Sequence, residues 1–263
     1  MQIFFRILLA IYLAHLLSDF IFQPASLVEQ KRRGKFSAYL FHGLIHYFTS
    51  ILLVGFFVRA SAASFRTYLV LLLLTTIHLL LDAAKIRLTA RGFLRNDALV
   101  YATDQLIHFF TIVLAAWLLA PGLALTQLFA FAGLSRIAQT KWFAVPIVYI
   151  GVVFGGGYLI RDLTRGMAEN IKKQSPAESG GELQNAGLYI GWLERFLVVT
   201  ALLLHSPATV GLILTAKSIA RYPEFKSKRF AEYFLIGTLL SISIAILGGA
   251  ILARVIFGAV QIP

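Results

Sequence analysis

The chain has 263 residues, of which 59% are hydrophobic and only 14% are charged, and its mean hydropathy is +0.79. This composition excludes an ordinary soluble domain, because soluble chains carry roughly a quarter charged residues. The formal net charge of +12 does not indicate a nucleic-acid partner here, since Lys and Arg gather at the ends of apolar runs, as they do beside membrane spans.

The sequence predicts an all-α fold, a polytopic bundle of about eight transmembrane helices. A span needs roughly 20 mostly apolar residues. The first run is expected to be a retained span and not a secretion signal, because it has no convincing basic start and contains His15 and Asp19. The expected spans lie near residues 3–22, 38–58, 66–84, 98–119, 143–160, 188–204, 207–222 and 231–257.

Residues 188–222 leave the span count open between eight and seven. They form either a tight hairpin around Ser206 and Pro207 or one kinked helix. Four regions follow from this pattern: a site region at 1–120, a fifth span with its outer loop at 121–161, a polar cytoplasmic linker at 162–187 and a three-span region at 188–263.

The basic residues predict the orientation of the helices. Lys and Arg next to spans are retained in the cytoplasm, and the basic groups that follow spans one, three, five and seven fall on one side if the N-terminus is outside. These groups include Lys31 to Lys35 and Lys85 to Arg95. We therefore expect a chain that crosses a membrane many times, with lipid as the surrounding partner.

An internal repeat is visible in the first 120 residues. His15-Leu16-Leu17-Ser18-Asp19 recurs as His78-Leu79-Leu80-Leu81-Asp82, and the segment from His42 to Thr49 recurs from Asp104 to Thr111. The matched helices are an even number of spans apart, so both copies cross in the same direction and can face each other.

Each copy of the repeat contributes two pairs of polar residues spaced four apart, which lie on one helix face. All eight groups are expected within roughly 15 Å of the cytoplasmic helix ends, at about 1.5 Å per residue. The predicted metal ligands are His15, Asp19, His42, His46, His78, Asp82, Asp104 and His108.

Ionisable groups inside spans are expensive and indicate a function. Because the chain has no cysteine, a metal would be held by imidazole and carboxylate, which suit one or two ions of zinc, manganese or iron. A carboxylate that stays uncoordinated, Asp82 or Asp104, is the expected general base. The structural alternative is a set of His–Asp pairs that hold the helices together or relay protons.

At these same residues the chain resembles a bacterial membrane-protein family known as domain of unknown function 3307, over about residues 1–120. Gly191 to Thr238 resembles the C-terminal region of longer members. The resemblance implies a location in a bacterial inner membrane, but the family name implies no activity. A looser resemblance links the embedded His and Asp pattern to inner-membrane metal-dependent hydrolases, whose Thr-His-Ser step is absent here.

The leading functional hypothesis is a membrane-embedded, metal-dependent hydrolase at the cytoplasmic interface, because two ions can clamp and polarise a phosphoryl or acyl substrate. The flanking basic loops favour an anionic, lipid-like substrate. A transporter of metal ions or protons is the first alternative, although the outer halves of spans one to four are apolar. A non-enzymatic membrane sensor or assembly partner is the second, and the oligomeric state is left open.

Two further features in the second half of the chain are expected to be structural. Gly151 and Gly155, with their neighbours Gly156 and Gly157, permit close helix packing. Glu194 and Arg195 are expected near the cytoplasmic interface, with their charged groups in water. His205 is expected in the turn of the hairpin.

Overall fold

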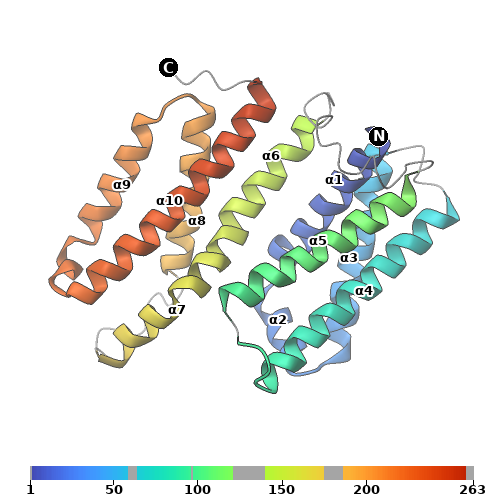
Figure 1. The fold of residues 1–263 in the computed structure, drawn as a ribbon, viewed down its shortest axis with the longest axis horizontal. Helices are drawn as coiled ribbons and strands as arrows, with labels where there is room; N and C mark the ends of the chain where they lie inside the picture. Colours follow the sequence, from blue (N-terminus) through green and yellow to red (C-terminus); the bar gives the residue numbers. More distant parts are fainter. Residues whose placement is uncertain (1, 59–63, 96, 121–139, 175–185, 259–263) are drawn as a thin grey trace. The chain divides into compact units, whose positions relative to one another are not determined.

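The computed structural model describes residues 2–58, 64–95, 97–120, 140–174 and 186–258 (Figure 1). Within these ranges the chain forms helices joined by turns and contains no strand, as the all-α prediction requires. The α-helices are α1 (Gln2–Leu16), α2 (Ala25–Arg32), α3 (Phe36–Phe57), α4 (Phe65–Ala90), α5 (Ala98–Leu119), α6 (Thr140–Ile150), α7 (Gly156–Gln174), α8 (Ala186–Leu203), α9 (Ala208–Ala220) and α10 (Lys228–Phe257).

Six helices in the described ranges are long and apolar enough to cross a membrane. They correspond to predicted spans one to five and eight, so the membrane-protein character of the chain is confirmed. Their bounds are Gln2–Ile21, Phe36–Phe57, Phe65–Ala90, Ala98–Leu119, Lys141–Ile171 and Lys228–Phe257.

The region of the predicted hairpin contains two helices, α8 and α9. They are joined by a turn at residues 204–207, in which His205 has a positive φ of 54°. The hairpin reading is therefore confirmed and the single kinked helix is wrong. At about 1.5 Å per residue α9 is about 20 Å long, shorter than a hydrocarbon core of roughly 30 Å, so eight full spans stay a prediction.

The chain divides into two compact units, Met1–Ile147 and Val148–Pro263, which are described separately. Residues 121–139, the greater part of the predicted outer loop, lie outside the described ranges. Residues 175–185 of the predicted linker do so as well. The linker was expected to begin at residue 162. In the structure α7 continues to Gln174, so the beginning of the predicted linker is helical.

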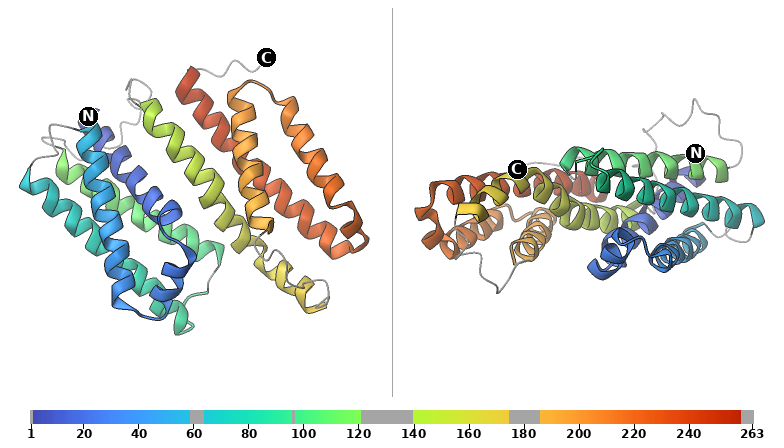
Figure 2. Two further views of the ribbon diagram at one scale, coloured as in Figure 1. Left: turned by 180° about the vertical axis from the view of Figure 1, so that it is seen from behind. Right: turned by 90° about the horizontal axis from the view of Figure 1, so that it is seen from below.

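In the first unit α1 is the central helix. It packs against α3 and α5, and α4 packs against the same two helices, an arrangement that Figures 1 and 2 allow the reader to follow. In the segment Gln2–Ile21, which contains α1, 61% of the most apolar stretch is buried. The corresponding share is 22–28% in α3, α4 and α5. The outer faces of those three helices carry exposed apolar side chains such as Phe48, Leu52 and Phe110, as expected of helices surrounded by lipid.

Local sequence signals set where these helices begin and end. Ser64 and Asp97 are the N-caps of α4 and α5 and accept hydrogen bonds from the amides of Thr67 and Val100, at 3.2 and 3.1 Å. Gly34 follows α2 with a φ of +73°, a conformation in which glycine is favoured.

The second unit is organised around Arg195, which is buried among helices. Its guanidinium donates to the carbonyl oxygen of Val153 at 2.8 and 3.1 Å and to Ser241 Oγ at 3.1 Å. The prediction of a solvated Arg195 is therefore wrong, because the π-helical turn Gly151–Gly155 and the side chain of Ser241 together provide acceptors inside the bundle.

Glu194 does not pair with its neighbour Arg195. Its Oε2 instead accepts a hydrogen bond from Lys217 Nζ, 2.7 Å away on α9. Its side chain is 13% exposed, so the prediction that its charged group lies in water is wrong, and its structural role stays a prediction.

Candidate metal centre

The eight residues predicted as ligands converge inside the first unit. They come from the last turns of the α1 segment, the first half of α3, the second half of α4 and the first half of α5. Seven of them are no more than 9% exposed, and the Asp19 side chain is 14% exposed. The four spaced pairs therefore meet in one buried cluster, as the repeat predicted.

Asp19 is surrounded by imidazoles from three helices. Its Oδ1 accepts a hydrogen bond from His46 Nε2 at 2.9 Å and lies 3.3 and 3.5 Å from the Nε2 atoms of His42 and His78. Its other oxygen, Oδ2, lies 3.6 Å from His15 Nε2. One carboxylate thus links α1 to both α3 and α4.

A π-helical turn, Leu17–Ile21, carries Asp19. Such turns are rare and occur frequently at functional sites, because the extra residue in the turn changes where the following side chains point. The α1 segment was predicted as a regular helix, so the pairing of His15 with Asp19 was expected from α-helical spacing. The pairing is present, but it spans the start of this π-turn.

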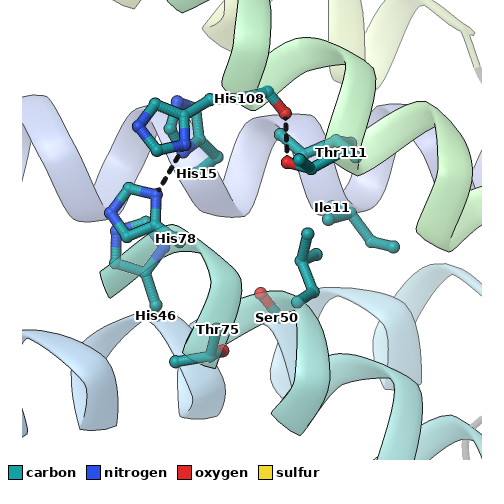
Figure 3. A pocket seen from close by; sticks show the side chains of 10 residues that line it. Ile11, His15, His46, Ser50, Thr75, His78, His108 and Thr111 are labelled. Atoms are coloured by element: carbon teal, nitrogen blue, oxygen red, sulfur yellow. Dashed lines mark hydrogen bonds between the residues drawn. The ribbon is translucent and has the colours of Figure 1, made fainter. Parts of the chain in front are cut away.

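Three imidazoles form a continuous chain through the cluster. His42 Nε2 lies 3.2 Å from His78 Nε2, and His78 Nδ1 lies 3.1 Å from His108 Nδ1, a contact drawn in Figure 3. A nitrogen–nitrogen hydrogen bond needs one protonated and one unprotonated partner. His78 uses both ring nitrogens in this way and lies at the centre of the cluster.

Asp82 and Asp104 are each paired with a lysine. Lys31 Nζ donates to Asp82 Oδ2 and Lys85 Nζ donates to Asp104 Oδ2, both at 2.6 Å. The Lys31 side chain is only 4% exposed, whereas that of Lys85 is 35% exposed. Each lysine contacts one oxygen, Oδ2, and the Oδ1 atom of each aspartate lies near His108.

His108 Nε2 is buried and has no hydrogen-bond partner among the described residues. It lies between the two free carboxylate oxygens, 3.8 Å from Asp82 Oδ1 and 3.6 Å from Asp104 Oδ1. A buried polar atom without a partner is unfavourable by about 1–3 kcal/mol. A cation coordinated by all three atoms would satisfy His108 Nε2 and both oxygens.

The donor atoms fall into three overlapping groups in which every atom lies within 4.8 Å of the others. Four ligands about 2.0–2.1 Å from zinc lie about 3.3 Å apart, close to the separations measured around Asp19 and His108. His78 is shared by the first and second groups, and Asp82 by the second and third. The groups are His15, Asp19, His46 and His78; His42, His78 and Asp82; and Asp82, Asp104 and His108.

A small cavity of about 10 Å³ borders the histidines, and Ile11 of α1 also lines it (Figure 3). Hydroxyl groups of Ser50, Thr75 and Thr111 line it together with His46, His78 and His108. Its size is near the lower limit for one water molecule. Farther along the helices Ile7, Val54 and Leu71 are fully buried, so the polar region ends in an apolar layer.

Sequence reasoning did not identify Lys31, Lys85 or Gln23 as parts of the cluster. Gln23 Nε2 lies 3.0 Å from both ring nitrogens of His42. Lys85 had a detectable signal, because His78, Asp82 and Lys85 are spaced four and three residues apart and share one helix face. For Lys31 no such signal exists, since α2 reaches the cluster only through the tertiary fold.

The family comparison matches the region that contains this cluster. Residues 7–134 match the family described as Protein of unknown function (DUF3307). We call residues 7–134 the DUF3307 region, because they are similar to this family. The match includes all eight predicted ligands together with Lys31 and Lys85, which confirms the resemblance found at these residues.

The other comparisons add no relative. No curated protein and no solved structure matches the chain. The looser resemblance to inner-membrane hydrolases is therefore unsupported. The DUF3307 match ends at residue 134, so the resemblance of residues 191–238 to the C-terminal region of longer members stays a prediction.

Proposed function

We propose that the DUF3307 region binds one or two divalent metal ions and works as a membrane-embedded hydrolase at the cytoplasmic face of a bacterial inner membrane, with the N-terminus outside. The proposal rests above all on His108 Nε2, which is buried without a partner between Asp82 Oδ1 and Asp104 Oδ1. Three donors that converge without a bond between them are typical of a cation site.

The number of donors in each group supports one closed metal site and one site with an open position. The group around Asp19 has four donors, which is the number in a closed tetrahedral site. The group around His108 has three donors, which leaves a position for water or substrate. Imidazole nitrogen and carboxylate oxygen suit zinc, manganese or iron.

The roles of the protein groups follow from their positions. A divalent ion, when bound, would supply Lewis-acid polarisation of a phosphoryl or acyl group and activation of water. Whichever of Asp82 and Asp104 stays uncoordinated would accept a proton from that water, while Lys31 and Lys85 hold the Oδ2 atoms of the two carboxylates in place. The apolar layer beyond the cavity would keep the reaction on one side of the bundle.

The deciding measurement is the metal content of the detergent-purified protein by elemental mass spectrometry. We expect near-stoichiometric zinc, manganese or iron in the wild type and loss of metal from a His78→Ala, Asp82→Ala double variant. Asp97→Asn is the control, because Asp97 caps α5 outside the cluster. A folded wild type that stays metal-free after reconstitution would refute the proposal.

Hydrolysis needs its own test once metal is found. The loaded protein would be screened with phosphoester and carboxylic ester lipids, and Asp82→Asn and Asp104→Asn would be compared at equal metal content. We expect turnover to fall by about 10²–10⁴-fold in the variant that lacks the base. Metal without turnover of any ester would instead favour a sensor or assembly partner.

A proton or metal-ion transporter is the second candidate, and one observation favours it. The chain of contacts from His42 through His78 to His108 is a hydrogen-bonded path along which protons can move. A transporter also needs access from the other side, and the buried layer of Ile7, Val54 and Leu71 opposes such access.

A further inference from the structure

Lys31 differs from the basic residues around it. Arg32, Arg33 and Lys35 are exposed, whereas Lys31 is 3% exposed and its side chain enters the cluster. The positive-inside rule explains the exposed residues, but it does not explain a buried ammonium group. Burying a lysine is unfavourable unless the group is paired, so its position calls for a role in the site.

Several contacts hold Lys31 in this position. The hydroxyl of Tyr39 donates to the carbonyl oxygen of Lys31 at 3.2 Å, and Leu27, one turn earlier on the same face of α2, is buried. Before α2, Gln23 contacts His42. The segment that carries Lys31 is thus fixed to the bundle at separate points, which pre-organises the ammonium group for a ligand.

The ammonium group contacts a residue that two of the donor groups share. Asp82 Oδ2, its partner at 2.6 Å, belongs to the donor group with His42 and His78, which overlaps both other groups. A lysine ammonium has three N–H donors, and the described contact with Asp82 uses one of them. The other two are available to a ligand that reaches the group of His42, His78 and Asp82.

The charges of the cluster favour an anionic ligand. When the imidazoles are counted as neutral, as metal ligands are, three aspartates and two lysines leave one net negative charge. One divalent ion changes this balance to one net positive charge, and a second ion makes it more positive. A metal-loaded cluster therefore attracts an anion, and lysine is a common point-charge partner of phosphate.

We propose that Lys31 is the anion-binding residue of the DUF3307 site and that its ligand is a phosphate group, either free or in the headgroup of a lipid. The inference rests on the proposed function, because the attraction depends on bound metal. It assigns to α2 the task of presenting a cation from the cytoplasmic side, while α1, α3, α4 and α5 supply the metal ligands.

The test compares three detergent-purified proteins, wild type, Lys31→Met and Lys35→Met, after metal content has been measured in each. Lys35→Met removes the same charge from an exposed position. Inorganic phosphate is titrated by calorimetry into each metal-loaded protein. A parallel titration uses short-chain phosphatidylglycerol, with short-chain phosphatidylcholine as the lipid of zero net charge, and identifies which source the site prefers. Lys31→Arg keeps the charge and tests rescue.

We expect phosphate or phosphatidylglycerol to bind the wild type and Lys35→Met equally. Lys31→Met should bind about tenfold more weakly or worse at unchanged metal content, and Lys31→Arg should recover part of the loss. Equal anion affinity in the wild type and Lys31→Met, or no anion binding by the metal-loaded wild type, would overturn the inference and leave the metal site intact. A wild type without metal would instead refute the proposed function.

Discussion

Lys31 Nζ and Asp82 Oδ2 lie 2.6 Å apart, although the two residues are 51 positions apart in the chain. Lys31 belongs to a short helix of eight residues and Asp82 to a helix of 26. The contact joins the segment after the first span to the interior of the third span. It makes the short helix part of the site.

This ion pair should be strongly coupled. Lys31→Met leaves the buried carboxylate of Asp82 without its partner and should lower the free energy of unfolding by about 3 kcal/mol in the metal-free protein. The double variant Lys31→Met, Asp82→Asn removes both charges and should recover much of that loss. Thermal unfolding of the two single variants and the double variant measures the coupling, and simple additivity of the losses would contradict a direct pair.

Asp19 should be the most sensitive single position for metal binding, because four imidazoles surround it. Asp19→Asn keeps the shape of the side chain but removes its negative charge, and we expect at least a tenfold loss of metal affinity, of the size seen when a site loses a ligand or its supporting partner. Titration with a competing chelator gives the affinity. An unchanged affinity would place the ion in another donor group.

Removing the metal should destabilise the protein. A ligand that binds only the folded state stabilises it by about 2.7 kcal/mol when its free concentration is 100 times its Kd. We therefore expect a chelator to lower the unfolding temperature of the wild type but not that of the His78→Ala, Asp82→Ala variant. An equal decrease in both proteins would mean that the chelator acts elsewhere.

Gly157 should tolerate no side chain. A Cβ atom there would lie 2.6 Å from Nη2 of Arg195 and 3.0 Å from Nε1 of Trp192. Gly157→Ala should therefore destabilise the second unit by about 1–3 kcal/mol. Gly151→Ala is the matched control, since no atom lies within 4 Å of its added Cβ. Thermal unfolding in detergent compares them, and equal unfolding temperatures would show that Arg195 can move aside.

Transport can be tested separately from hydrolysis. Proteoliposomes that contain an ion-sensitive dye should show no uptake of zinc or protons beyond empty liposomes, because Ile7, Val54 and Leu71 form a buried apolar layer beyond the cavity. Adding an ionophore for the tested ion shows that the liposomes of each preparation are sealed and that the dye responds to the ion. Uptake by the wild type that is lost in His78→Ala would support the transporter and weigh against the hydrolase.

Much of the candidate site could be predicted from the sequence, because helical spacing is a local property. Residues four apart lie on one face of a helix whatever surrounds it, so the pairs His15 with Asp19 and His78 with Asp82 were visible without a structure. The repeat then indicated that the pairs would meet, and in the structure they do. The apolar runs likewise determined where the long helices lie, since a span needs a fixed length of apolar chain.

Other features depended on contacts between distant segments. Whether Lys31 faces water or enters the bundle depends on how α2 packs. The sequence around Lys31 does not reveal this, because it looks like an ordinary basic loop. The same holds for Arg195, whose partners Val153 and Ser241 lie 42 and 46 positions away. The sequence by itself determined the helices, their polar faces and the donor atoms. Only the tertiary structure decided which charges were paired, because pairing requires a particular approach of separate helices.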